Sequence, residues 1–213
     1  MKDRFLVSTL IVSGLALSLF AQVGNNNGVL NPNRASAEEL AALSQIDTGL
    51  AGTIVAERPF LSMTELDAFL KPSVAGEARA ELYRKLFIPI NLNSASREEI
   101  LLVPGVGRRM AHEFEEYRPY KAMPQFRREM GKYVDDDEVA RMEQYVFVPI
   151  ELNTASDEDI LSIPGVGPRM LHEFKEYRPY KSLDQFRREI GKYVDDKELE
   201  RLARYVRLKG SGT

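Results

Sequence analysis

Cysteine and tryptophan are both missing from this chain of 213 residues, and histidine occurs only twice. Without cysteine the chain forms no disulfide, offers no thiolate ligand to a metal and has no cysteine nucleophile. An excess of positive charge is missing as well, because the formal net charge is −3 at pH 7. The chain as a whole is therefore not a uniformly basic nucleic-acid-binding protein, although one face could still be basic.

One long apolar run is present, at residues 5–20, behind two basic residues and ahead of a polar stretch. This order is typical of a signal peptide. Ala21 suits the last position before cleavage, whereas Leu19 stands where a small residue is preferred, so cleavage and retention as a membrane anchor both remain open. We expect a signal peptide or anchor helix at 1–22, a polar linker at 23–29 and export to the periplasm or cell envelope.

The rest of the chain repeats itself every 60 residues, which is the first feature to establish in any sequence. The tetrapeptide Pro-Gly-Val-Gly at 104–107 recurs at 164–167, and Glu-Tyr-Arg-Pro-Tyr-Lys at 116–121 recurs at 176–181. A more diverged copy begins with Asn-Arg-Ala-Ser at 33–36. The sequence therefore predicts three tandem units, at 30–90, 91–150 and 151–208, with a flexible tail at 209–213.

Each unit has the sequence signals of about four short helices. Ser36, Ser96 and Ser156 are each followed three residues later by an acid, which predicts a capping box at the start of the first helix. In the last unit Ser182 and Asp195 mark the starts of the third and fourth helices. No alternating strand pattern is present, and the Ile-Pro-Ile joints between units are too short to build a sheet. We expect an all-α fold.

The segments Ile100–Ala111 and Ile160–Leu171 resemble the helix-hairpin-helix motif. With the Leu-Asn-Thr-Ala-Ser start and the Arg-Pro-Tyr exit, the unit resembles the DNA-binding domain of ComEA-type competence proteins. The resemblance implies an exported or membrane-anchored protein that binds double-stranded DNA without sequence preference, in DNA uptake. The phosphate-binding residues that we predict are Gly105, Val106, Gly107, Arg108 and Arg109 in the second unit and Gly165, Val166, Gly167 and Arg169 in the third.

The chemistry of these turns supports that interpretation independently. Two glycines allow a tight turn with positive φ and leave no Cβ in the way. Backbone amides at the start of the following helix then carry partial positive charge, which suits an anion. Arg109 and Arg169 in the first helical turn add charged donors. The alternative is structural, since the same turn is also a good junction between two helices.

Three other hairpins carry aspartate instead: Asp47 in the first unit and Asp135 and Asp195 in the second half of the later units. An aspartate at a helix start caps the amides with its own carboxylate and repels a phosphate. We expect these hairpins to be structural, so that the first unit has no DNA-facing hairpin.

Further candidates have a functional and a structural interpretation. The basic groups at 127–132 and 187–192 are either part of a DNA-facing surface or, as we favour, exposed helix sides paired with Glu129 and Glu189. The tyrosines around each Arg-Pro motif either stack on bases or, as we favour, pack in the core; they are Tyr117, Tyr120, Tyr177 and Tyr180. We expect the two histidines, His112 and His172, on the surface, because one histidine per unit is a poor metal site.

No catalytic constellation, metal-binding cluster or phosphate-binding loop of a nucleotide hydrolase is recognisable, so we expect a protein without enzymatic activity or cofactor. Two functions remain open. One is an envelope protein that grips the backbone of double-stranded DNA; the other is a scaffold for an envelope protein partner, related to helix-hairpin-helix components of secretion systems. The paired glycine turns favour DNA, and the negative charge and the aspartate hairpins favour the scaffold.

Overall fold

The computed structural model describes residues 28–209. The predicted signal peptide or anchor, most of the predicted linker and nearly all of the predicted tail lie outside this range. Within it, no helix combines the length and the hydropathy that crossing a membrane requires.

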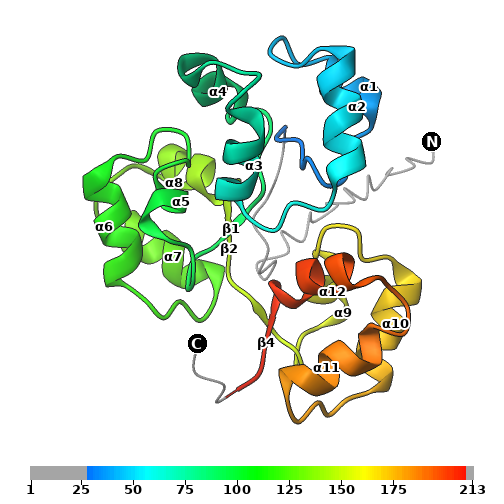
Figure 1. Cartoon of the computed structure of the whole chain (residues 1–213). Helices are drawn as coiled ribbons and strands as arrows, with labels where there is room; N and C mark the ends of the chain where they lie inside the picture. The colour runs from blue at the N-terminus through cyan, green and yellow to red at the C-terminus, as the bar shows by residue number, and fades with distance from the viewer. Residues whose placement is uncertain (1–27, 210–213) are drawn as a thin grey trace, which may run out of the picture.

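The described chain is mostly helical, with four short helices in each 60-residue repeat (Figure 1). The first repeat contains α1 (Ala37–Ala41), α2 (Thr48–Glu57), α3 (Met63–Leu70) and α4 (Gly76–Leu82). The second contains α5 (Arg97–Ile100), α6 (Arg108–Glu116), α7 (Met123–Met130) and α8 (Asp136–Glu143). The third contains α9 (Asp157–Leu161), α10 (Pro168–Glu176), α11 (Leu183–Ile190) and α12 (Asp196–Ala203).

The mostly helical architecture agrees with the predicted all-α class, but short strands form at the joints between units, where the sequence analysis expected no sheet. β1 (Ile90–Asn91) pairs in parallel with β2 (Val146–Phe147), and β3 (Ile150–Glu151) pairs in parallel with β4 (Val206–Arg207). An isolated bridge joins Leu30 to Leu86 in the first repeat. Each pairing ties the beginning of a repeat to its end. The sequence gives little sign of this, because a two-residue strand has no alternation to read.

The first helix of a repeat is capped as predicted in two of three copies. Ser36 and Ser156 form complete capping boxes with Glu39 and Asp159. At Ser96 the prediction is half wrong. The hydroxyl of Ser96 accepts from the amide of Glu99, but the Glu99 carboxylate accepts from the amide of Met63 at 2.9 Å instead of reaching back. Because α3 of the first repeat packs against α5 of the second, the Glu99 carboxylate binds across the boundary between the two repeats.

A hydrogen-bonded clamp explains why the Asn-x-Ala-Ser start and the Arg-Pro exit recur together. In the second repeat the Asn93 side-chain amide donates to the Tyr120 carbonyl at 2.9 Å and accepts from the Tyr120 amide at 2.6 Å. The Arg118 guanidinium donates to the carbonyls of Leu92 and Ala95 at 2.6 and 2.7 Å. Asn33 and Asn153 make the same paired bonds. The Arg-Pro peptide bond at the exit of each repeat is cis, at Arg58–Pro59, Arg118–Pro119 and Arg178–Pro179.

Two hydrophobic clusters form the core. One is continuous through the first and second repeats, and the other belongs to the third. Tyr120 and Tyr180 are 1% and 3% exposed, which confirms that they are core residues. Tyr117 and Tyr177 are half-buried against these clusters, and their hydroxyls bond to those of Tyr133 and Tyr193.

The repeats also touch one another through polar groups. The Tyr145 hydroxyl donates to the Arg84 carbonyl at 3.3 Å, and the Arg204 guanidinium donates to the Pro89 carbonyl at 3.3 Å. The three repeats therefore pack together around their short strands (Figure 1).

Candidate functional site

The two glycine turns join α5 to α6 and α9 to α10. Gly105 and Gly165 have φ of +78° and +86°, a region that L side chains rarely adopt. The second glycine of each turn, Gly107 or Gly167, is the N-cap of the following helix, in ordinary extended conformation. Gly105 and Gly107 are exposed, as is Gly165, while Gly167 is half-buried. The glycine turns therefore lie at the surface of the protein.

The valine between the glycines has a different role from the one predicted. Val106 and Val166 are buried, and their amides donate to the carbonyls of Val103 and Ile163, both at 3.0 Å. These two amides are engaged within the turn, so neither is open to an anion. Val106 and Val166 anchor the turn to the core. The candidate phosphate contacts are therefore the other predicted residues of each turn, without these two valines.

The amides that follow the turn are open. In the part of the chain from 28 to 209, no hydrogen bond is donated by the amides of Gly107, Arg108, Arg109 and Met110 at the start of α6. The same holds at the start of α10 for Gly167, Arg169 and Met170, and Pro168 has no amide to donate. A glycine N-cap offers no side chain to fill these positions. Such amides, at the positive end of a helix, suit an anion.

The aspartate hairpins differ in this respect. The carboxylates of Asp47, Asp135 and Asp195 accept from the amides of Leu50, Glu138 and Glu198 at 2.8, 2.9 and 2.8 Å. This confirms that the three aspartates cap their helices. At these helix starts the aspartate carboxylate already occupies the position where a phosphate would bind, and its negative charge would repel one.

Unpaired positive charge surrounds the open amides. Arg108, Arg109 and Arg169 are exposed, and none makes an ion pair or side-chain hydrogen bond among the described residues. Many other arginines on the surface, in contrast, form salt bridges with glutamate. Three guanidinium groups are thus available beside two sets of open amides.

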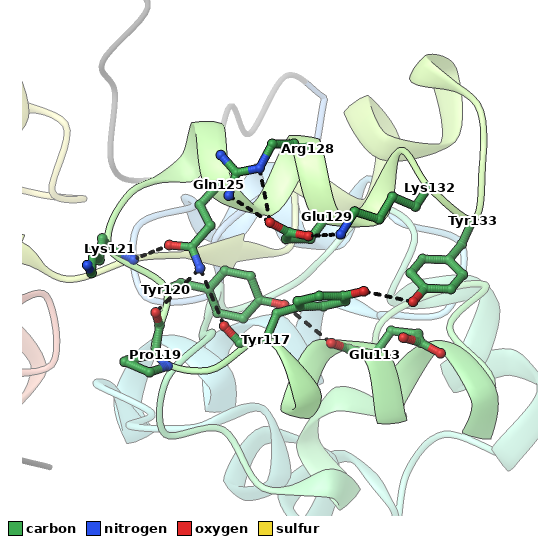
Figure 2. Close-up of polar contacts among 10 residues, drawn as sticks. All are labelled: Glu113, Tyr117, Pro119, Tyr120, Lys121, Gln125, Arg128, Glu129, Lys132 and Tyr133. Atoms are coloured by element: carbon green, nitrogen blue, oxygen red, sulfur yellow. Dashed lines mark hydrogen bonds and ion pairs between the residues drawn. The ribbon is translucent and has the colours of Figure 1, made fainter.

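The predicted basic groups at 127–132 and 187–192 are paired instead, as Figure 2 shows for Arg128 and Lys132 of the second repeat. Arg128 binds the Glu129 carboxylate at 2.7 Å, and Lys132 binds its other oxygen. Arg188 and Lys192 make the equivalent pairs with Glu189. These hydrogen-bonded pairs lower the pKa of Glu129, so the carboxylate stays charged and the pairs persist. The structural interpretation of these residues is confirmed.

Sequence reasoning missed an arginine behind each glycine turn. A Cβ added to Gly105 would lie 2.7 Å from Nη2 of Arg141, a residue of α8. Arg141 also donates to the Pro104 carbonyl and is held by Glu138. Arg201 occupies the equivalent place beside Gly165. The sequence does show arginine at both 141 and 201, one repeat apart. This recurrence does not reveal that the two arginines lie against the glycine turns.

A cavity of about 530 Å³ opens beside the first glycine turn. Residues 103–107 form one wall, and α4 of the first repeat forms another. Its charged lining consists of Asp67, Arg79 and Arg84, and Asp67 is already engaged by Arg79 and by the Tyr83 hydroxyl. No unpaired carboxylate therefore lines this cavity in the described structure.

The other predicted surface residues lie where expected. His112 and His172 are exposed, and His172 pairs with Glu176 at 2.8 Å. Across residues 28–209, no group of histidine and carboxylate side chains is arranged to hold a metal ion.

Comparisons with family models, with curated proteins and with solved structures find no match to this chain.

Proposed function

We propose that this protein binds the phosphate backbone of double-stranded DNA through its two glycine turns, each acting as the turn of a helix-hairpin-helix motif. The contacts are the open amides at the starts of α6 and α10 together with Arg108, Arg109 and Arg169. We further propose that it acts without catalysis, as an exported envelope protein in DNA uptake.

One observation carries this proposal: the two hairpins whose second helix begins at an uncapped glycine also carry arginines, unpaired among the described residues, in the first turn of that helix, whereas the three that begin at a capping aspartate do not. Asp47, Asp135 and Asp195 cap the second helix in three of the other hairpins, and the remaining one, before α4, has an uncapped Ala75 followed by Glu77 in the first turn. A turn needed only to join two helices would gain stability from such a cap, because aspartate in place of a glycine N-cap contributes a few tenths of a kcal/mol and its negative charge at the helix start adds roughly 0.3–1 kcal/mol. Two turns that forgo it and carry arginine instead are better suited to an external anion.

Backbone amides, and guanidinium groups when they contact phosphate, carry no sequence code. Contacts to phosphate oxygens fix position on the duplex, while sequence is read from base edges in the grooves. We therefore propose binding without sequence preference.

The two turns act as separate contacts. Figure 1 shows α6 and α10 on opposite flanks of the molecule, with the strand pairs between them. Changes at sites far apart add in free energy. We expect loss of one turn to weaken binding and loss of both to abolish it.

The test is titration of labelled duplex with purified full-length protein in mild detergent, at several salt concentrations. Backbone binding predicts a logarithmic loss of affinity with salt, with a slope of about −0.9 per phosphate neutralised. Arg109→Glu combined with Arg169→Glu should abolish binding and flatten this slope.

The matched control is Arg128→Glu combined with Arg188→Glu. These side chains are both 66% exposed, lie in the same two repeats and change the net charge equally. Binding should largely survive in the control. Equal loss in both double variants would show that only overall charge matters, and no binding by the unaltered protein at low salt would favour the scaffolding alternative.

A further inference from the structure

An arginine of the first repeat lies directly over the glycine turn of the third. A Cβ added to Gly165 would lie 2.9 Å from Nη1 and 3.0 Å from Cζ of Arg34. On the same glycine, Nη2 of Arg201 would lie 3.2 Å from that position. Glycine at 165 thus allows two guanidinium groups to approach the turn closely, one of them from a part of the chain more than a hundred residues away.

Arg34 departs from the repeat pattern. The equivalent positions in the second and third repeats hold Ser94 and Thr154, so only the first repeat places a guanidinium here. Arg34 is exposed and, in the range that the structure describes, makes no ion pair or hydrogen bond through its side chain. Arg201, in contrast, is 2% exposed and is held by Glu198. Arg34 is therefore not explained by a role in holding the fold together.

Positive charge accumulates around this turn. Burial lowers the pKa of Arg58, and the nearby charge of Arg34 lowers it further. Glu198 of α12 is already engaged by both Nε and Nη2 of Arg201, so it does not neutralise Arg34. Like charges this close repel one another unless an anion lies between or beside them.

With Arg34 included, the glycine turns of the second and third repeats each have two guanidinium groups that are unpaired within residues 28–209. The second repeat has Arg108 and Arg109 at the start of α6, while the third has Pro168 and Arg169 at the start of α10. Proline supplies neither charge nor amide. Arg34 restores the missing second guanidinium from outside the repeat.

We propose that Arg34 binds the same phosphate group as the open amides of α10 and Arg169, so that the third repeat's site is built jointly by the first and third repeats. This inference rests on the proposed function. It assigns a binding role to the first repeat, whose own hairpin is closed by Asp47.

The test isolates the third repeat's site by using a parent variant with Arg108→Gln and Arg109→Gln. In that parent, Arg34→Gln should weaken duplex binding about tenfold, as expected for one lost charge-assisted contact. The magnitude of the salt slope should fall by less than about 0.9, because Arg169 and the α10 amides still hold the shared phosphate. Arg34→Lys retains the charge and should keep part of the affinity. Because Arg34 makes no internal bond, thermal unfolding should be unchanged in both variants.

The matched control is Lys71→Gln in the same parent. Lys71 is an exposed cation of the first repeat whose ammonium has no partner among residues 28–209, and its loss should leave affinity nearly unchanged. If Arg34→Gln behaves like Lys71→Gln while Arg169→Glu abolishes binding, the joint site is wrong and the proposed function stands. If unaltered protein fails to bind duplex at low salt, both proposals fall together.

Discussion

Introducing a cap into an open glycine turn should separate folding stability from DNA binding. The change is Gly107→Asp, which gives the second repeat's turn the residue that the aspartate hairpins already have at the equivalent place. Gly107 has φ −94° and ψ 179°, which aspartate adopts readily. A Cβ at this position meets nothing within 4 Å. The substitution therefore fits without rearrangement.

The expected gain in stability is modest. Replacing a glycine N-cap with aspartate contributes a few tenths of a kcal/mol. A negative charge at a helix start adds roughly 0.3–1 kcal/mol. The sum is about 1 kcal/mol, which corresponds to an increase in melting temperature of roughly 3 °C for a chain of this size.

The expected effect on binding is opposite in sign and larger. The introduced carboxylate occupies the amides and repels a phosphate at the place where Arg108 and Arg109 would hold it. Loss of hydrogen bonds to a charged group costs about 1.5–3 kcal/mol, or roughly ten- to a hundredfold in affinity. Gly107→Asp with Gly167→Asp should abolish binding. Duplex titration and thermal unfolding of the same samples measure both effects.

Two control variants separate charge from shape. Gly107→Ala adds a Cβ without a carboxylate, and Gly107→Asn adds a neutral cap. The alanine variant should retain most of the affinity, and the asparagine variant should lie between alanine and aspartate. The reasoning is refuted if Gly107→Asp binds duplex as well as the unaltered protein, or if it lowers the melting temperature.

Three further changes test the fold. Asn93→Ala removes both hydrogen bonds to the Tyr120 backbone and should destabilise the protein by roughly 2–4 kcal/mol in urea unfolding; a loss under 0.5 kcal/mol would contradict the clamp. Ala122→Ser supplies the hydroxyl cap that α7 lacks and that Ser182 provides to α11, and should stabilise by about 1 kcal/mol in thermal unfolding. Burial raises the pKa of Glu143 above its usual 4.5, against the opposing effect of Arg127, so its contribution to stability is present below pH 4.5 and is lost as pH rises through the raised pKa. Urea unfolding should therefore show Glu143→Gln gaining stability relative to the unaltered protein between pH 4 and pH 7, and no change in the difference would exclude this titration.

The local features of the fold were predictable because they depend on neighbours in sequence. Ser36, Ser156 and Asp135 cap their helices through amides three residues away, and that spacing is visible in the chain itself. Arg109 and Arg169 were likewise predicted in the first turn of a helix, and α6 and α10 begin one residue before them, at Arg108 and Pro168.

The features that sequence reasoning missed depend on partners that are distant in sequence. Glu99 has the spacing of a capping box, yet its carboxylate binds Met63 because α3 packs beside α5. Arg34 lies over Gly165 only because the first and third repeats meet. The periodicity of a repeat describes each unit and contains no information on how units pack, so these contacts were outside its reach.

Net charge is a weak guide to the phosphate binding that we propose, because it ignores how the charges are paired in the structure. The formal charge of −3 counts every carboxylate equally. Many of these carboxylates, such as Glu129, Glu138 and Glu198, are held by arginine or lysine within the protein. Arg108, Arg109 and Arg169, at the starts of the helices that follow the glycine turns, are unpaired in the described chain. An approaching phosphate responds to the local potential within about 10 Å at moderate salt, not to the sum over the chain. The acidic first turns of α8 and α12 then act against binding at the aspartate hairpins and leave the glycine turns as the favourable places for a phosphate to approach.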